Sequence, residues 1–176
     1  MASKSPFDRA IRQLELVPPE ALGRAHALVI GVGAIGRHFA LQLAALGVPR
    51  MSLFDDDIVA IENLAPQGYW PEDLGVAKAT VTGQLCKRIF SEIELTIEPE
   101  KFRRSSARRY QSVPNLAVFF CVDSIATRRI IWQAVRGCAE LVVDGRMSAE
   151  VIRVLAVRPS VLNGGYDATL FDGSEA

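Results

Sequence analysis

The feature that most constrains this sequence is a glycine-rich turn between an apolar run and an amphipathic segment. Residues 27–31 read Ala-Leu-Val-Ile-Gly, a continuous apolar run typical of a parallel strand buried on both faces. Over residues 34–46 apolar side chains recur every three or four positions, which predicts a helix packed on the sheet. Between them, Gly31, Gly33 and Gly36 have the spacing Gly-x-Gly-x-x-Gly. Such glycines permit a tight turn and bring backbone N–H groups close to a phosphate at the helix N-terminus.

The remainder of the chain repeats this order of strand and helix. Further strands are expected over residues 51–54, 94–97, 116–122 and 141–143, and further helices over 76–90 and 124–135. The order predicts an α/β fold of the Rossmann-like, doubly wound class, with a mainly parallel sheet. A last apolar run, 151–157, follows a turn at 147–150 that is too short for a helical crossover, so we expect an antiparallel C-terminal strand.

Length and composition indicate one domain over residues 1–176. The 176 residues are 49% hydrophobic, enough for one substantial core. Residues 1–25 are expected to form an N-terminal helical segment, and residues 160–176 a polar tail. Lys plus Arg and Asp plus Glu each total 20, so no net field attracts the chain to nucleic acid or membrane.

The apolar runs and the cysteines indicate a reduced, cytoplasmic protein. No apolar run approaches the roughly 20 residues that cross a bilayer, and the first ten residues have no apolar signal region. Cys86, Cys121 and Cys138 lie in apolar settings and form no Cys-x-x-Cys pair, so no zinc site is expected. A nucleophilic cysteine acts as an exposed thiolate, and none of the three fits that role.

Acidic residues at the end of the second strand are the next candidates for a nucleotide site. Asp55 lies about twenty residues beyond the glycine turn, where a carboxylate reaches ribose hydroxyls, a pattern that suits NAD as well as ATP. The alternative is that Asp55, Asp56 and Asp57 are only turn residues, which we prefer for Asp56.

Five further motifs accompany the glycine turn, four after it in the chain and one before it. Residues 55–59 read Asp-Asp-Asp-Ile-Val and residues 63–67 read Asn-Leu-Ala-Pro-Gln. Residues 74–79 read Leu-Gly-Val-Ala-Lys-Ala, residues 121–123 read Cys-Val-Asp, and residues 9–13 read Arg-Ala-Ile-Arg-Gln. With the glycine turn, these motifs resemble those of the ThiF/MoeB family and the related ubiquitin-activating enzymes, over roughly Arg9 to Val157.

The resemblance implies an activity and roles for individual residues. Family members adenylate the C-terminal carboxylate of a ubiquitin-like or sulfur-carrier protein ending in Gly-Gly, using ATP and Mg²⁺ and releasing pyrophosphate. Lys78 matches the lysine that touches the nucleotide phosphates, and Asp123 the aspartate that serves Mg-ATP. Arg12 matches an arginine that reaches the neighbouring subunit's nucleotide, which implies a homodimer. Asn63, Asp55 and Asp57 match nucleotide-binding positions.

Elementary chemistry agrees with these roles. Two anions, a carboxylate and a triphosphate, must meet, so cations have to neutralise the phosphates. Lys78, Arg12 and an Mg²⁺ held by Asp123 are suited to do so. Each residue also has a plainer interpretation: Lys78 and Arg12 as solvated surface side chains, and Asp123 as a cap of the following helix.

Pro66 stands where the family usually has an arginine, which keeps open a catalytically weak or inactive subunit that acts by dimerisation or partner binding. A second alternative is an NAD-dependent oxidoreductase. It rests on the glycine turn and Asp55 alone and leaves Asn63, Lys78 and Asp123 unexplained.

A basic run of Arg103, Arg104, Arg108 and Arg109 is either a solvated face or a docking surface for an acidic protein. The triplet Asp144-Gly145-Arg146 ends the fifth strand without a role that spacing assigns. Neither His26 nor His38 is expected to be catalytic.

Overall fold

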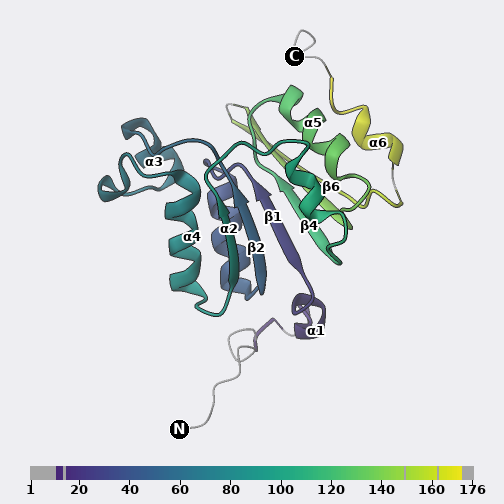
Figure 1. The fold of residues 1–176 in the computed structure, drawn as a ribbon, viewed down its shortest axis with the longest axis horizontal. Helices are drawn as coiled ribbons and strands as arrows, with labels where there is room; N and C mark the ends of the chain where they lie inside the picture. The colour runs from purple at the N-terminus through teal and green to yellow at the C-terminus, as the bar shows by residue number, and fades with distance from the viewer. Residues whose placement is uncertain (1–10, 14, 149, 162, 172–176) are drawn as a thin grey trace.

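A computed structural model describes residues 11–13, 15–148, 150–161 and 163–171, and its strands form one six-stranded sheet (Figure 1). The strands are β1 (His26–Ile30), β2 (Arg50–Phe54), β3 (Glu94–Glu98), β4 (Leu116–Phe120), β5 (Leu141–Ser148) and β6 (Val151–Val157). Their order in space is β3-β2-β1-β4-β5-β6, parallel except for β6, which runs antiparallel to β5. The predicted fold class and the antiparallel last strand are therefore confirmed.

The strand order reverses at β1. The chain first builds outward through β2 to β3 and then returns to the other side of β1 with β4. Ile30 pairs with Phe54 of β2 and with Phe120 of β4, so the three strands end level with one another. A crevice at the carboxyl ends of strands where the order reverses is the usual ligand site of doubly wound folds.

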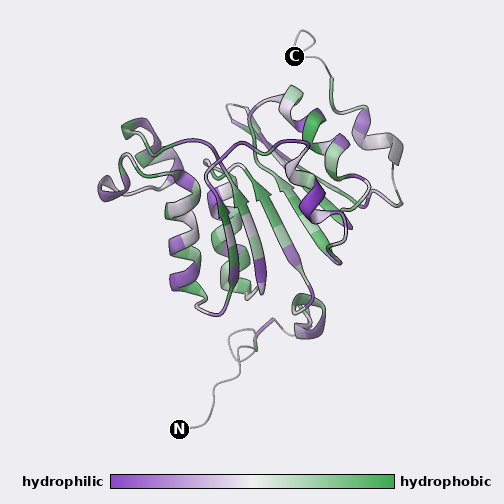
Figure 2. Cartoon of the chain, viewed as in Figure 1, coloured by the Kyte–Doolittle hydropathy of each residue, from purple (hydrophilic) through white to green (hydrophobic). Residues whose placement is uncertain are grey.

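Helices cover both faces of the sheet (Figure 1). Helices α2 (Gly36–Leu46) and α4 (Lys78–Ile89) pack on one face over a core that includes Ala40, Leu53 and Cys86. Helix α5 (Ile125–Val135), the 3-10 helix η4 (Ser106–Tyr110) and α6 (Asn163–Asp167) pack on the other. The strands between these layers are mainly hydrophobic, as expected of strands buried on both sides (Figure 2).

Local sequence signals explain where the main helices begin and end. Gly47 adopts the left-handed conformation, with φ of 90°, and its N–H closes the last turn of α2. Ser124 caps α5, since its hydroxyl accepts a hydrogen bond from the Thr127 N–H at 3.3 Å. The helices expected over 34–46, 76–90 and 124–135 are confirmed, each beginning one or two residues later than the pattern indicated.

Two segments differ from the sequence expectation. β5 continues past Val143 to Ser148, because residues 142–148 pair with β6 in a hairpin that closes at Ser148 and Val151. The segment expected to be only a polar tail contains α6, whose Tyr166 is 3% exposed and packs against Trp132 with ring centroids 4.6 Å apart. Tertiary packing, rather than intrinsic helix propensity, accounts for a helix at this glycine-rich position.

In the described part of the N-terminal segment, the helix is α1 (Pro19–Leu22), while Arg12 is exposed in a turn. Arg9 and the rest of residues 1–10 lie outside the described residues. Among the helices that the structure describes, none is long and apolar enough to span a membrane.

Candidate active site

A pocket of about 840 Å³ opens at the carboxyl ends of β1, β2 and β4 and extends to the β5–β6 hairpin. That volume lies in the range of small-molecule and cofactor sites. Its lining includes six residues that the sequence nominated: Gly31, Gly33, Asp55, Asp57, Lys78 and Asp123. The fold therefore brings together residues separated by as much as 92 positions in the chain, from Gly31 to Asp123.

The three glycines of the turn differ in why a side chain would or would not fit at their positions. Gly31 has φ of 87°, and a Cβ on it would lie 2.6 Å from the Cys121 carbonyl oxygen. A Cβ on Gly36 would lie 1.8 Å from the Gly31 carbonyl oxygen, so this glycine is required for α2 to approach β1. At Gly33 the nearest atom to a Cβ is 3.8 Å away. Gly33 is thus the one whose open side faces the pocket, where a ligand can approach the backbone.

Asp55 ties the end of β2 to the glycine turn. One carboxylate oxygen accepts a hydrogen bond from the Val32 N–H at 2.7 Å and the other from the Asp57 N–H at 2.9 Å. Burial raises the pKa of Asp55 above its usual 3.8, and these two backbone hydrogen bonds partly oppose the shift. Each oxygen keeps a free lone pair, so the carboxylate can also accept from ligand hydroxyls.

Lys78 is a buried cation at the first residue of α4. Its side chain is 6% exposed, and its Nζ lies 2.8 Å from Asp57 Oδ2, whereas the Asp57 side chain is 66% exposed. The Lys78 N–H also donates to the Asp57 carbonyl at 2.9 Å. The plainer interpretation of Lys78 as a solvated surface lysine is wrong, because the side chain is held inside the pocket wall.

Asp123 follows β4 with an exposed side chain, and Ser124 rather than Asp123 caps α5. Helix capping therefore does not account for the Asp123 carboxylate. Its backbone is fixed instead, since Arg128 Nη1 donates to the Asp123 carbonyl oxygen at 3.1 Å. Asp123 is held at the pocket rim with its carboxylate available.

Three nominated residues lie outside the pocket lining within the described part of the chain: Gly36, Asn63 and Arg12. Asn63 uses its side-chain oxygen to accept from the Ala60 N–H at 2.9 Å, which stabilises the turn before α3 (Leu64–Gln67). For these three residues, as for the six in the pocket lining, direct contact with nucleotide stays a prediction.

Gln67 lines the pocket and was not nominated from the sequence. It belongs to a lobe between β2 and α4 formed by the 3-10 helices η2 (Ile61–Asn63) and η3 (Pro71–Asp73) on either side of α3. Arg37 holds this lobe, donating to the Gln67 carbonyl at 3.1 Å and the Gly68 carbonyl at 2.7 Å. Tyr69 completes the attachment, since its hydroxyl donates to the Val32 carbonyl at 2.8 Å. Only the fold reveals that Gln67 faces Gly33.

The sequence analysis also did not predict a buried cluster of charged side chains at the end of β5. Asp144 is 0% exposed and accepts from Arg128 Nε at 2.9 Å, from Arg146 Nε at 2.7 Å and from the Tyr166 hydroxyl at 2.8 Å. Both arginines line the pocket. The triplet Asp144-Gly145-Arg146 was the available signal, but its partner Arg128 is distant in sequence.

The cysteines and His26 are not suited to chemistry in the pocket, although Cys121 belongs to its lining. Burial raises the pKa of the Cys86 thiol to about 11 and of the Cys121 thiol to about 12, which opposes thiolate chemistry. His26 lies at the amino end of β1, with Nε2 3.0 Å from the Ser52 hydroxyl, and burial lowers its pKa. The described residues contain no group of three His, Cys, Asp or Glu side chains suited to a metal ion.

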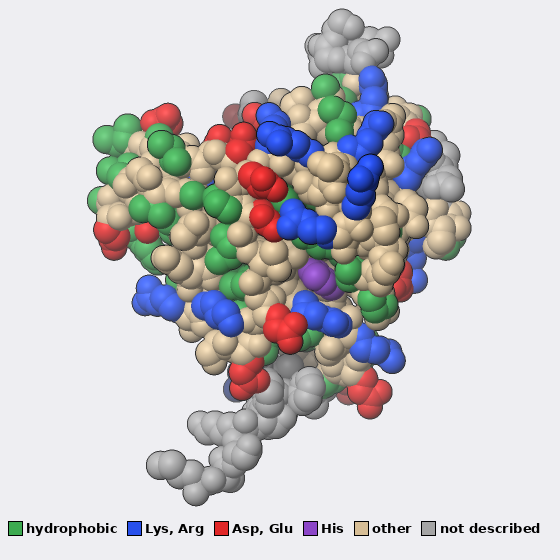
Figure 3. All heavy atoms as spheres, viewed as in Figure 1, with side chains coloured by type: hydrophobic (Ala, Val, Ile, Leu, Met, Phe, Trp, Pro, Cys, Tyr) green, Lys and Arg blue, Asp and Glu red, His purple; other side chains and the backbone are tan. Residues whose placement is uncertain are grey.

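The four arginines of the basic run between β3 and β4 are exposed. Figure 3 shows Lys and Arg side chains gathered at the upper right of the face in view, with acidic side chains beside some of them. Arg109 pairs with Glu98 and lies 3.7 Å from Glu100, while Arg104 donates to Gln133 at 2.8 Å. A docking role for this run stays a prediction.

A sequence profile of the ThiF family matches residues 7–155, most of the chain. The chain belongs to the ThiF family. This ThiF-family chain is 33% identical over 115 residues to the adenylyltransferase and sulfurtransferase MOCS3 of Sus scrofa. That match covers 62% of this chain and 24% of the relative. It is 32% identical over 108 residues to the sulfur carrier protein ThiS adenylyltransferase of Escherichia coli, covering 61% of this chain and 43% of the relative.

Solved structures also resemble this ThiF-family chain. The Escherichia coli tRNA N6-threonylcarbamoyladenosine dehydratase TcdA in complex with ATP superimposes with a TM-score of 0.70 at 25% identity, covering 82% of this chain and 61% of that one. PaaA superimposes with a TM-score of 0.74 over 94% of this chain and 55% of that one; at 20% identity this shows the fold alone. The chain thus spans 24% to 43% of the length of these curated relatives.

Proposed function

We propose that this ThiF-family chain binds Mg-ATP and adenylates the C-terminal carboxylate of a ubiquitin-like or sulfur-carrier protein, with release of pyrophosphate. The observation that carries the proposal is the position of Lys78. A lysine that is 6% exposed lines the same pocket as the open Gly33 and the free Asp123 carboxylate. A buried cation beside a backbone turn at a helix N-terminus is suited to phosphate.

In the proposed reaction a carboxylate oxygen of the partner attacks the α-phosphorus of ATP. The bond from the α-phosphorus to the bridging oxygen breaks, and pyrophosphate leaves with that electron pair. Lys78 neutralises the phosphates, Asp55 accepts from the ribose hydroxyls, and Arg12 is supplied by a second copy of the chain. Fixing both anions in place removes much of the entropic and electrostatic barrier.

Magnesium fits the residues present. Mg²⁺ is usually held by one or two carboxylates together with substrate phosphates and waters, so a three-residue protein cage is not needed. Asp123 offers a free carboxylate at the rim, and the ion bound there would neutralise phosphate charge.

The relatives support adenylation as the reaction class. Two of them are named adenylyltransferases, one for the sulfur carrier protein ThiS, and the ATP-bound TcdA shares the fold. A second candidate substrate is tRNA, because a relative that is 30% identical over 102 residues is the tRNA threonylcarbamoyladenosine dehydratase of Escherichia coli. That match covers 57% of this chain and 38% of the relative.

ATP–pyrophosphate exchange tests the proposal. The purified chain and its Lys78→Ala and Asp123→Ala variants are each assayed with and without ubiquitin-like and ThiS-type sulfur-carrier proteins ending in Gly-Gly. We expect carrier-dependent exchange that both substitutions abolish. ATP binding without exchange in any pairing would instead support an inactive subunit, and tight NAD binding without ATP binding an oxidoreductase.

A further inference from the structure

The two ends of the pocket carry opposite charge. Toward β2 and β3 the acidic side chains of the lining outnumber the basic ones: the acids are Asp55, Asp56, Asp57 and Glu100, and the bases are Lys78 and Lys101. At the β5–β6 end it includes the guanidinium groups of Arg128, Arg146 and Arg153. The nucleotide features therefore gather at one end, and the other end presents positive charge with no role in the proposed nucleotide contacts.

Arg146 and Arg153 face each other directly across the β5–β6 pair. Opposite residues of an antiparallel pair project from the same face of the sheet, and like charges placed this way destabilise the pair. Arg153 is exposed, and the described residues provide it with no carboxylate partner. An anion between the two guanidinium groups would relieve their repulsion.

Arg146 is held rigidly in this position. Besides its hydrogen bond to Asp144, its Nη1 donates to the Thr169 carbonyl at 2.8 Å and its Nη2 to the Thr169 hydroxyl at 2.9 Å. Its side chain is 12% exposed. Asp144 is shared by Arg128 and Arg146, while Arg153 lies opposite Arg146, so the three arginines together keep surplus positive charge. Fixed charge in a partly dry wall binds anions well, since little reorganisation is needed.

We infer that Arg146 and Arg153 form an oxyanion subsite that receives the terminal carboxylate of the acyl substrate. Carboxylate and phosphate oxygens share the chemistry that such a pair recognises. The carboxylate is favoured because the glycine turn and Lys78 already provide for phosphates, and the hairpin adjoins that turn: a Cβ on Gly145 would lie 2.9 Å from Ile35 Cγ2. The identity of this anion rests on the proposed function, whereas the existence of the subsite does not.

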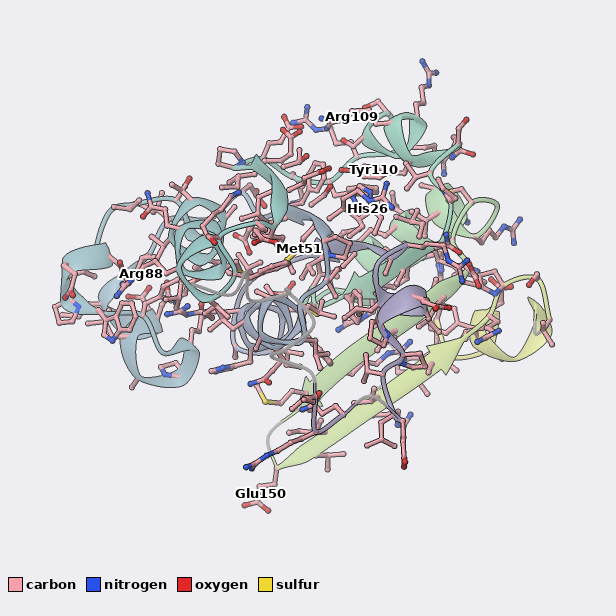
Figure 4. The ribbon with its side chains drawn as sticks, turned by 90° about the horizontal axis from the view of Figure 1, so that it is seen from below. His26, Met51, Arg88, Arg109, Tyr110 and Glu150 are labelled. Atoms are coloured by element: carbon pink, nitrogen blue, oxygen red, sulfur yellow. The ribbon has the colours of Figure 1, made fainter. Side chains whose placement is uncertain are left out.

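The hairpin position makes the inference testable without disturbing the nucleotide end. Figure 4 shows Glu150, at the hairpin turn, on the opposite side of the molecule from Arg109 and far from Arg88. Arg153→Gln removes an exposed charge and no buried partner, so the melting temperature should be unchanged or raised. Arg158→Gln is the matched control, because Arg158 is exposed just after β6 and does not line the pocket.

Isothermal titration without nucleotide compares a peptide ending in Gly-Gly as the free acid with the same peptide as its C-terminal amide. Wild type and Arg158→Gln should bind the free acid at least about tenfold more tightly than the amide, as expected for a charge-assisted contact. In Arg153→Gln that preference should fall to about threefold or less, with ATP affinity unchanged. The variant Arg146→Gln, in which the buried Asp144 carboxylate keeps its ion pair with Arg128, should lose the preference as well.

Equal binding of acid and amide by wild type, or no binding of either up to millimolar peptide, overturns the inference. So does an acid preference that survives in Arg153→Gln. If Arg153→Gln weakens ATP while the acid preference persists, the subsite holds phosphate and the carboxylate assignment is wrong. The titration needs no turnover, so a chain that fails the exchange assay can still pass this test, and an active chain can fail it.

Discussion

At the scale of single residues, Lys78 is the cation on which nucleotide binding should depend most. Lys78→Met keeps much of the side-chain volume in the wall but removes the charge beside Asp57. We expect ATP dissociation constants to rise at least about tenfold, the usual cost of one charge-assisted contact. Calorimetric titration with ATP measures this. Lys87→Met, which removes an exposed lysine of the same helix, should leave ATP binding unchanged, and equal effects in both variants would contradict the assignment.

Asp55 should make stability depend on pH in a predictable direction. Its pKa is raised by burial, so the folded chain binds its proton more tightly than the unfolded chain. This contribution to stability is complete below pH 3.8 and is lost as pH rises through the folded-state pKa. Urea unfolding from about pH 4 to neutrality should therefore show wild type losing stability relative to Asp55→Asn. Asp56→Asn, at an exposed position, is the control. If the difference in unfolding free energy between wild type and Asp55→Asn does not change with pH, the raised pKa of Asp55 is not its cause.

At the scale of elements, the contact of α2 with the strand ends depends on Gly36. Gly36→Ala would place a methyl group 1.8 Å from the Gly31 carbonyl oxygen. We expect a loss of about 1–3 kcal/mol in the free energy of unfolding, as in other overpacked sites. Gly137→Ala, with no atom within 4 Å, should be neutral or slightly stabilising. Gly33→Ala should keep stability and lose ATP affinity, because its methyl group would enter the pocket; thermal melts and titrations distinguish the three.

The helices and strands could be predicted where the local hydrophobic pattern of the sequence alone accounts for the element that the fold contains. The strand at 27–31 and the helix that follows were predictable because a buried parallel strand and an amphipathic helix have different periods. Helix α6 was not, because its stability comes from Tyr166 packing on Trp132 and donating to Asp144. The full length of β5 depends likewise on pairing with β6, which a single-strand pattern does not contain.

In the candidate site, too, some residues could be predicted from the sequence and others are brought in only by tertiary contacts. Asp55 was accessible because one helix and one strand fix its spacing from the glycine turn, whereas Lys78 was nominated through the resemblance of residues 74–79 to a family motif. Gln67 and Arg153 enter the pocket only through the lobe held by Arg37 and through the hairpin register. No periodicity or spacing encodes those contacts, so sequence reasoning nominated residues at the β2 end of the pocket and missed its basic end.

At the scale of the whole molecule, the proposed dimer is the main untested feature. Apolar side chains are exposed on the lobe beside the pocket; they belong to Ile58, Ile61, Trp70, Leu74 and Val76. Clusters of exposed apolar residues often mark interaction sites. Arg12 is exposed and lies outside the pocket lining of its own chain, so a role at the nucleotide requires that it be supplied by a second copy.

Mixing two inactive variants tests whether Arg12 acts between subunits. Arg12→Ala and Lys78→Ala homodimers should each lack exchange activity, for different reasons. In a mixed dimer one site carries both substitutions, while the other combines an intact Lys78 with the intact Arg12 of its neighbour. If subunits exchange freely, half of the dimers are mixed and about a quarter of wild-type activity should return. An arginine acting within its own chain would give no recovery, and light scattering of the mixture establishes whether a dimer is present at all.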